Sequence, residues 1–437
     1  GKTTCVPLAL LDEPWLGDRK IVMLEPRRLA ARAAARFMAR SLGERVGETV
    51  GYRVRLDTRV GPNTRIEVVT EGVLARVLQD DPALESVGLV IFDEFHERSL
   101  QADLGLALCL DSQEALREDL RLLVMSATLD VAPVAQLLRG APVLSSEGRS
   151  YPVEIHYGRA RQSGERNSER VVTAIQQALR ENPSSSVLAF LPGQGEIRYC
   201  AAALREWLQQ SGIVGVHLQA LYGNLSIDEQ QSAIVALSGA QAGDRKVVLA
   251  TNIAETSLTI EGVDVVVDSG LERIARFDPV TGMNGLHTVR ISRASSEQRA
   301  GRAGRLRPGK CYRLWSAEQQ QQLAAHAVAE ILSADLAPLA MQLLQWGIDD
   351  PAELRWLDTP PRGPWQQAVD LLASLGAVEE RGGARMLSAH GAAMAELPAH
   401  PRLAHMLLCG AASAQGQTAA LLAALLSDRD PLQDQPD

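Results

Sequence analysis

Two adjacent carboxylates, Asp93 and Glu94, directly follow an apolar run at Gly88–Phe92. The run has the length and the β-branched content of a buried strand. In open parallel sheets, ligands bind beyond the carboxyl ends of the strands. One carboxylate there can hold Mg²⁺ while the other orients and deprotonates water, as hydrolysis of a nucleotide requires. The same dipeptide also suits a solvated acidic turn, so other residues must decide between the two interpretations.

Residues with phosphate chemistry stand at the beginning of the chain, where Gly1, Lys2, Thr3 and Thr4 match the tail of the phosphate-binding loop G-x-x-x-x-G-K-[ST]. Lys2 would contact the β- and γ-phosphates of a nucleotide, and the hydroxyl of Thr3 would bind Mg²⁺. We expect the front half of this loop and its strand to lie outside the 437 residues, as does the continuation of the last helix. A fragment of this kind should bind a nucleoside triphosphate poorly, whereas the parent protein hydrolyses it.

Three arginines, Arg299, Arg302 and Arg305, are spaced by three within the segment Gln298–Arg305. If this segment is a helix, the three side chains share one face. Two glycines inside the helix would cost about 1 kcal/mol each relative to alanine. A solvated helix has no reason to carry that cost, whereas a helix that approaches another surface closely does. Guanidinium groups directed at a transferring phosphoryl group would provide such a reason.

Hydroxyl and guanidinium side chains also follow several predicted strands of both halves. Such groups suit contact with a sugar–phosphate backbone that does not depend on base sequence. Each one alone also suits a turn or a helix cap. The segments that carry these groups are Leu24–Arg28, Thr70–Gly72 and Ala250–Ser257.

The composition indicates a globular protein of two or three domains, because 437 residues exceed the size of one ordinary core. The net charge of −9 and the pI of about 5.5 argue against nucleic acid as a partner, but a groove that follows phosphates needs only local positive charge. No apolar run approaches the ~20 residues that span a bilayer. The widely separated cysteines without a CxxC pair argue for reduced cytosolic thiols rather than for a disulfide or zinc framework. They are Cys5, Cys109, Cys200, Cys311 and Cys409.

Strand-like runs alternate with helix-like segments over the first three hundred residues and restart after Tyr151. This alternation predicts an α/β fold with two tandem lobes, each built on a parallel sheet that helices cover on both faces. The first lobe has a helix-like segment at Arg28–Leu42. Its predicted strands are Lys20–Leu24, Arg65–Val69, Gly88–Phe92 and Leu120–Met125, and those of the second lobe are Ser186–Leu191, Val216–Leu221, Lys246–Ala250 and Gly262–Asp268.

The chain becomes helical from about Ser316, with predicted helices at Glu330–Trp346 and Trp365–Leu375 and a hairpin at Ala377–Leu387. This order suggests a small winged-helix-like module, although a plain helical cap fits the pattern equally well. A further helix begins at Pro401. We therefore divide the chain into residues 1–150, 151–315, 316–395 and 396–437: first lobe, second lobe, winged-helix-like module and the start of another helical region.

Two further motifs, Phe190–Gln194 and Leu221–Gly223, complete a set whose order and spacing are specific. With them the chain resembles the DEAH-box helicases of superfamily 2, most closely the bacterial HrpB type, from Gly1 to about Leu407. Phe95, which replaces the usual alanine of D-E-A-H, is typical of that type. The resemblance implies two RecA-like lobes, a winged-helix domain and a helical ratchet-like domain. It also implies an ATP-dependent RNA helicase that couples hydrolysis to translocation or unwinding.

The resemblance also implies roles for individual residues. Gly1, Lys2, Thr3 and Thr4 would bind the nucleotide phosphates, and Thr3 and Asp93 would hold Mg²⁺. Glu94 would activate the attacking water, His96 would link the site to the second lobe, and Gln298 would help to place the water. Arg302 and Arg305 would act as arginine fingers. The residues that would contact the nucleic-acid backbone are Arg27, Arg28, Thr70, Thr251 and Ser257. The stretch Glu272–Ser292 resembles the β-hairpin that inserts between nucleic-acid strands.

Two alternative functions stay open. A DNA-directed translocase would use the same motor, because no motif reads the 2′-hydroxyl that separates RNA from DNA. A nucleotide-gated factor that remodels ribonucleoprotein complexes would need no strand separation. We expect ATP or another nucleoside triphosphate and Mg²⁺ as cofactors, RNA as the partner, no membrane, and a cytoplasmic monomer.

Overall fold

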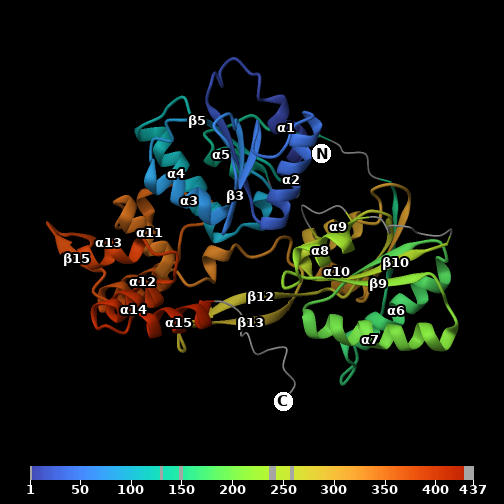
Figure 1. The fold of residues 1–437 in the computed structure, drawn as a ribbon. Coiled ribbons are helices and arrows are strands. Elements are labelled where there is room, and N and C mark those ends of the chain that lie inside the picture. The colour runs from blue at the N-terminus through green and yellow to red at the C-terminus, as the bar shows by residue number, and fades with distance from the viewer. Residues whose placement is uncertain (1, 128–130, 147–150, 236–242, 256–259, 428–437) are drawn as a thin grey trace.

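The first lobe of the computed structural model contains a six-stranded sheet with the order β3-β2-β4-β1-β5-β6, in which only β3 runs antiparallel to its neighbour (Figure 1). The strands are β1 (Lys20–Glu25), β2 (Val50–Val54), β3 (Asp57–Arg59), β4 (Ile66–Thr70), β5 (Val87–Phe92) and β6 (Arg121–Val124). The helices are α1 (Lys2–Ala9), α2 (Arg28–Ser41), α3 (Glu71–Asp80), α4 (Leu100–Ala115) and α5 (Val131–Leu137). The structure describes residues 2–127, 131–146, 151–235, 243–255 and 260–427.

Burial on both faces explains why the central strands of this sheet are continuous apolar runs. Every residue of β5 is buried, as expected for a strand between two helical layers. On one face, α2 presents a stripe of alanines, whose small side chains let the helix lie close to the sheet. On the other face, α3 and α4 pack with the C-terminal region in one apolar cluster.

The second lobe contains another six-stranded sheet, with the order β7-β14-β11-β8-β10-β9 and only parallel pairs. Its strands are β7 (Val153–Tyr157), β8 (Ser186–Phe190), β9 (Val216–Leu221), β10 (Arg245–Ala250), β11 (Val263–Asp268) and β14 (Gly309–Arg313). Its helices are α6 (Asn167–Glu181), α7 (Gln194–Ser211), α8 (Ile227–Ile234) and α9 (Arg293–Gly301), and the short helix α10 (Ala317–Gln321) follows β14. The predicted α/β fold with two parallel-sheet lobes is confirmed.

A long antiparallel hairpin, β12 (Leu271–Asp278) and β13 (Met283–Arg290), leaves the second lobe and extends to the C-terminal helices (Figure 1). At its tip, Asp278 accepts hydrogen bonds from the Val280 backbone N–H and the Thr281 hydroxyl, and Gly282 adopts φ 66°. These bonds define a tight turn at the tip of a hairpin that lies within the predicted stretch Glu272–Ser292.

The C-terminal region packs against the first lobe rather than standing apart. The indole of Trp346 donates a hydrogen bond to Asp111 on α4 at 2.7 Å, and the apolar cluster of α3 and α4 continues into this region. Its helices are η3 (Glu330–Leu332), α11 (Ala337–Trp346), η4 (Pro351–Glu353), α12 (Arg362–Ser374), α13 (Ala389–Ala395), α14 (Pro401–Ala412) and α15 (Gly416–Ser427), and its hairpin is β15 (Val378–Arg381) with β16 (Ala384–Leu387). The positions of the domain boundaries stay predictions.

Two predicted helices differ from the structure. The segment Glu330–Trp346 is not one helix, because a short 3₁₀ turn and a break precede α11. Asp335 accepts the N–H of Ala337, and Pro338 stands in the first turn, where proline is tolerated. The segment Gln298–Arg305 is also not one helix, because α9 ends at Gly301.

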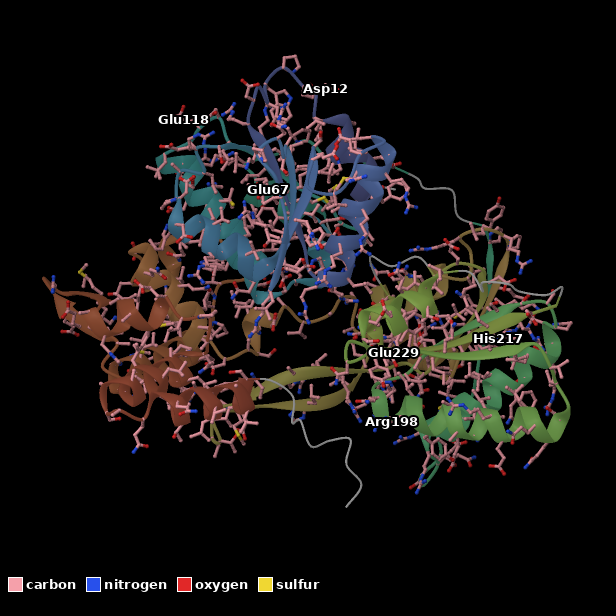
Figure 2. All side chains as sticks on the ribbon, viewed as in Figure 1. Asp12, Glu67, Glu118, Arg198, His217 and Glu229 are labelled. Atoms are coloured by element: carbon pink, nitrogen blue, oxygen red, sulfur yellow. The ribbon has the colours of Figure 1, made fainter. Side chains whose placement is uncertain are left out.

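Charged side chains cover the outer surfaces, and Asp12 and Glu118 lie at the end of the first lobe that is remote from the hairpin (Figure 2). No helix within the described ranges is both long and apolar enough to cross a membrane.

Candidate active site between the two lobes

The carboxyl end of β5 places the two carboxylates at the sheet edge. The N–H of Asp93 donates to the carbonyl of Leu24 on β1 at 3.1 Å, which extends the strand pairing by one residue. The chain then turns sharply, because Glu94 adopts φ 49°, and its N–H donates to Oδ1 of Asp93 at 2.8 Å. Left-handed backbone at a residue other than glycine is uncommon and gathers at functional sites. Both side chains are nearly buried, with 4% and 9% exposure.

Lys2 on α1 faces both carboxylates. Its Nζ lies 3.9 Å from Oδ1 of Asp93 and 3.7 Å from Oε2 of Glu94. Within the described part of the chain, Nζ of Lys2, Oδ2 of Asp93 and Oε2 of Glu94 are buried without a hydrogen-bond partner. Buried polar atoms of both signs without hydrogen bonds are costly unless a ligand completes them. Together with the half-buried Thr3 and Thr4 on the same helix, these atoms fit a polyphosphate and a divalent cation.

Glu25 adds a third carboxylate that the sequence analysis did not assign. It ends β1, beside Asp93, and is fully buried. Burial raises the pKa of Glu25 well above its usual range, and the charges of Asp93 and Glu94 raise it further. A bound cation would relieve this repulsion. The pairing of β1 with β5 is the signal that could have identified Glu25, because neighbouring parallel strands end at the same edge.

His96 connects the carboxylate pair to the second lobe. Its Nδ1 lies 3.5 Å from Oε2 of Glu94, and its Nε2 lies 2.8 Å from Nε2 of Gln298 on α9. Because an amide nitrogen can only donate, His96 accepts at Nε2 and carries its proton at Nδ1, the atom that faces Glu94. The structure therefore brings together two predicted site residues that are 202 positions apart.

Arg302 follows α9 and is almost buried, with 7% exposure. Its Nε donates to the carbonyl oxygen of Glu255 at 2.9 Å, and a second N–H of the guanidinium donates to the same oxygen. Burial, followed by the charge of Arg305, lowers the pKa of Arg302 to about 9, while Glu94 acts in the opposite direction. Glu94 also attracts Arg305, whose side chain is exposed. Two cations of the second lobe thus lie within the field of Glu94.

The predicted common face of the three arginines is wrong. Because α9 ends at Gly301, Arg299 points into its own lobe, where it is 1% exposed. It donates to Glu255 at 2.9 Å and to Asp268 at 3.0 Å, and its guanidinium lies 4.9 Å from the centroid of the Phe190 ring. Burial alone would lower the pKa of Arg299, but the surrounding carboxylates outweigh burial and raise it.

The expected close approach lies at Gly304 rather than inside a helix. A Cβ on Gly304 would stand 2.5 Å from the carbonyl oxygen of Tyr151 and 2.8 Å from the side chain of Val153. Gly301 has no atom within 4 Å of such a Cβ. Only one of the two glycines is therefore required by packing.

The residues predicted to contact nucleic acid occupy different settings. Arg27 joins the lobes, because it donates to Glu97 at 3.2 Å and to the carbonyl oxygen of Asn252 at 3.1 Å. Arg28 is exposed at the start of α2. Thr70 occupies the N-cap position of α3 without a side-chain capping bond, and Thr251 follows β10. Ser257 and Gly1 lie outside the described residues.

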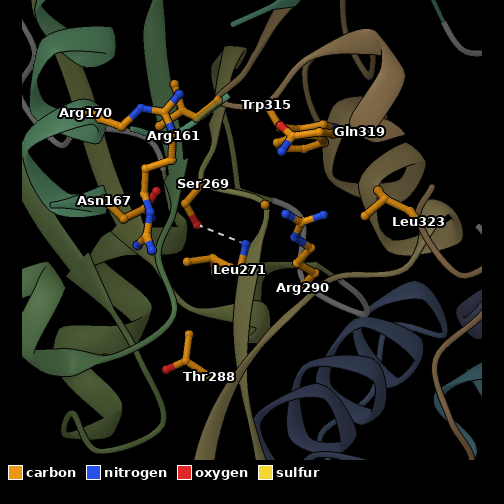
Figure 3. A pocket seen from close by; sticks show the side chains of 12 residues that line it. Arg161, Asn167, Arg170, Ser269, Leu271, Thr288, Arg290, Trp315, Gln319 and Leu323 are labelled. Atoms are coloured by element: carbon orange, nitrogen blue, oxygen red, sulfur yellow. Dashed lines mark hydrogen bonds between the residues drawn. The ribbon is translucent and has the colours of Figure 1, made fainter. Parts of the chain in front are cut away.

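A cavity of about 280 Å³ at the base of the hairpin was not anticipated from the sequence (Figure 3). Arg161, Arg170 and Arg290 line it together with Trp315. Nδ2 of Asn167, which also lines the cavity, is buried without a hydrogen-bond partner among the described residues. Guanidinium, amide and aromatic groups around one cavity suit a phosphate and a stacked ring. These residues come from separate elements, so no local sequence motif predicts the cavity.

Comparison with known proteins agrees with this geometry. Residues 1–137 match the family described as DEAD/DEAH box helicase, and residues 170–307 match the helicase conserved C-terminal domain. The ATP-dependent RNA helicase HrpB of Escherichia coli (strain K12) is 53% identical over 428 residues, which are 98% of this chain and 51% of that protein. The ATP-dependent RNA helicase HrpA homolog of Haemophilus influenzae (strain ATCC 51907 / DSM 11121 / KW20 / Rd) is 34% identical over 99% of this chain and 33% of that protein.

Solved structures extend the match to the fold. The crystal structure of the Escherichia coli DEAH/RHA helicase HrpB superposes with a TM-score of 0.89 at 51% identity, over 100% of this chain and 54% of that one. The crystal structure of the E. coli DExH-box NTPase HrpB superposes with a TM-score of 0.85 at 51% identity, over the same shares. The chain spans about half the length of the HrpB proteins that it matches. By its two helicase domains, its sequence and its fold, this chain belongs to the DEAD/DEAH-box helicase family.

Proposed function

We propose that the protein to which this chain belongs is an ATP-dependent RNA helicase, which couples hydrolysis of a nucleoside triphosphate to translocation on, or unwinding of, RNA. One observation carries the proposal. Lys2, Asp93 and Glu94 present buried polar atoms without hydrogen bonds on one lobe, and Arg302 of the other lobe lies within the electrostatic reach of Glu94. An anionic substrate between the lobes would satisfy both sides.

The residues of the first lobe would bind the phosphates, hold Mg²⁺ and accept a proton. Lys2, with Thr4, would bind the phosphates, and Thr3 and Asp93 would hold Mg²⁺, which neutralises phosphate charge when bound. Glu94 would take the proton of the attacking water. The N–H at Nδ1 of His96, which faces Glu94, would orient that carboxylate.

The residues of the second lobe would complete the site when the lobes are in contact. Gln298 would place the water while its amide holds His96. Arg302 and Arg305 would balance the negative charge that develops on the transferring phosphoryl group. The two hydrogen bonds that Arg302 donates to the carbonyl oxygen of Glu255 preorganise its guanidinium, so little reorganisation is needed during the reaction.

A chain of backbone contacts offers a route from this site to the hairpin. The carbonyl of Arg98, which ends the turn after the carboxylates, accepts the N–H of Glu330 at 3.0 Å. The carbonyl of Ser333 in the same segment accepts the N–H of Phe277 on β12 at 3.2 Å. We propose that changes at the nucleotide reach the hairpin along this path, so that hydrolysis moves the element that separates strands.

The hairpin itself has the side chains of a wedge. Val280, Met283 and Leu286 are 93%, 66% and 73% exposed. Exposed apolar groups on a rigid hairpin can insert between stacked bases. The arginine-lined cavity at the base of the hairpin and the exposed Arg28 would then contact the phosphates of a strand. We also propose that the protein acts in the cytoplasm and as a monomer.

The test of the proposal is the rate of ATP hydrolysis by the purified protein to which this chain belongs, measured without nucleic acid, with RNA and with DNA. We expect RNA to stimulate hydrolysis most, and Glu94→Gln to lower the rate at least about 100-fold while nucleotide binding survives. Glu118→Gln, an exposed carboxylate on the outer end of the same lobe (Figure 2), is the matched control. Normal hydrolysis by Glu94→Gln would refute its role, and equal stimulation by DNA would refute the preference for RNA.

A second measurement separates unwinding from remodelling without strand separation. Val280→Ser combined with Leu286→Ser changes only exposed side chains of the hairpin, so folding should be preserved. Unwinding of a duplex should fall by a much larger factor than hydrolysis. If unwinding and hydrolysis fall together or neither falls, the hairpin does not act as the separating element.

A further inference from the structure

Outside the interlobe site, two histidines and a cysteine meet where α13 packs against α14. Nε2 of His390 lies 2.9 Å from Nδ1 of His405, and the two rings are nearly perpendicular, at 88°. Sγ of Cys409 lies 3.5 Å from Nε2 and 3.9 Å from Nδ1 of His405. One possible ligand atom from each of the three residues can be chosen so that all three atoms lie within 4.8 Å of one another.

The sequence places two of these groups together, and the tertiary fold adds the third. His405 and Cys409 are four residues apart on α14, so their side chains lie on one helical face. His390 comes from the preceding helix, α13. The bond between the two imidazoles could serve simply to join the helices, but it does not explain a thiol at the same point.

Two of the three separations between donor atoms are close to those of a tetrahedral metal site. Zinc bonds of about 2.05 Å to nitrogen and about 2.3 Å to sulfur give separations of about 3.3 Å between two nitrogens and about 3.6 Å between nitrogen and sulfur. The separations of 2.9 Å between His390 and His405 and of 3.9 Å between His405 and Cys409 differ from these by less than half an ångström, and the separation between His390 and Cys409 is no more than 4.8 Å. Rotation of the side chains, above all of the exposed Cys409, would bring the three donor atoms to this geometry.

Space for a fourth ligand lies beside the thiol. A cavity of about 340 Å³ between α14 and α15 is lined by Cys409, Met406 and Ser413, and Cys409 is exposed. Water can enter such a cavity and occupy the remaining position. Two imidazoles, one thiolate and one water form a ligand set that suits zinc better than magnesium or calcium, which prefer oxygen.

We propose that His390, His405 and Cys409 bind one Zn²⁺ ion. Both imidazoles bind in the neutral form, and the thiol releases its proton to solvent as the sulfur–zinc bond forms. The ion joins α13 to α14, and so links the two regions that the sequence analysis divides between residues 395 and 396. The first turn of α14 also approaches the hairpin tip, because the Arg402 guanidinium lies 2.9 Å from the position of a Cβ on Gly282. Zinc would therefore stiffen the support on which the hairpin rests.

The experiment is a calorimetric titration of ZnCl₂ into chelator-treated protein, together with the absorption spectrum after addition of CoCl₂. We expect one zinc ion per chain and a cobalt–thiolate charge-transfer band. Cys409→Ser should abolish the band and weaken zinc binding by more than the roughly 10–100-fold that loss of an outer-shell partner costs. Zinc should also raise the melting temperature of the wild type and leave that of Cys409→Ser unchanged.

Two matched controls test the assignment. Cys5→Ser removes the other exposed thiol, and His217→Ala removes an exposed histidine on β9 of the second lobe (Figure 2). Both variants should bind zinc as the wild type does. His390→Gln, which can keep a hydrogen bond to His405, should lose zinc binding and stay folded. Undiminished binding in Cys409→Ser or His390→Gln, or no binding by the wild type, would show that the cluster serves only to join the helices.

Discussion

Replacement of Arg299 by methionine should destabilise the second lobe by about 3–5 kcal/mol, the range found when one partner of a buried ion pair is removed. Arg299 is 1% exposed, and its carboxylate partner Asp268 is 0% exposed at 3.0 Å. Methionine fills most of the space but leaves Asp268 buried without its cation. The stacking of Arg299 on Phe190, at 4.9 Å, is lost as well, which adds about 0.5–2 kcal/mol to the expected cost.

The loss should grow with pH. Burial raises the pKa of Asp268, and Arg299 partly offsets that effect. Without the arginine, the pKa of Asp268 in the folded state rises further above its value in the unfolded state. The folded state then binds more protons than the unfolded state in the interval between the two values, so stability falls as pH rises through it. The stability of Arg299→Met should therefore be closer to that of the wild type at pH 5 than at pH 8.

Thermal unfolding followed by calorimetry provides the measurement. For a lobe of this size, about 2–4 °C per kcal/mol applied to a total of about 3.5–7 kcal/mol gives a decrease of about 7–28 °C in the melting temperature of that lobe. The double variant Arg299→Met/Asp268→Asn should recover at least about 1 kcal/mol, because it removes the charge that Arg299→Met leaves unpaired. Arg305→Met, at an exposed position of the same segment, is the control and should change stability by less than about 0.5 kcal/mol. If Arg299→Met proved as mild as Arg305→Met, the buried network would not contribute as we describe.

Three other predictions follow from single contacts. Burial raises the pKa of Glu71 from 4.5 to about 7, so stability should fall as pH rises between these values. Glu71→Gln should remove that dependence and gain at most about 3 kcal/mol at pH 8, as urea unfolding at pH 5 and pH 8 would show. His96→Ala and Gln298→Ala should each reduce the rate of RNA-stimulated hydrolysis. The double variant should lose no more activity than the more severe single variant, because both substitutions break the same hydrogen bond between the lobes. Strictly additive losses of activity would contradict this reasoning. Gly304→Ala should cost about 1–3 kcal/mol by overpacking, since its Cβ would stand 2.5 Å from the Tyr151 carbonyl. An unchanged melting temperature for Gly304→Ala would mean that the backbone there yields easily.

Local patterns predicted the elements that depend on local physics. The apolar run before Asp93 has the length and the β-branched content of a buried strand, and the position of Asp93 and Glu94 at the edge of the sheet follows from that. The alternation of strands and helices was sufficient for two parallel-sheet lobes. The short strands β2 and β7 were not predicted, because their partly polar sequences carry little periodic signal.

The sequence by itself determined which chemical groups this protein holds at its strand ends, because strand period and strand polarity are set within a few residues. Only the tertiary structure decided which of those groups meet. Three arginines of the same type at equal spacing have different settings, since α9 ends at Gly301, so that Arg299 lies inside its lobe, Arg302 faces the interlobe site and Arg305 is exposed. Glu25 joined the carboxylate pair, and His390 joined His405, through packing between segments that no local rule relates. The physical reason is that backbone geometry repeats over a few residues, whereas burial and charge depend on everything that the folded chain brings near.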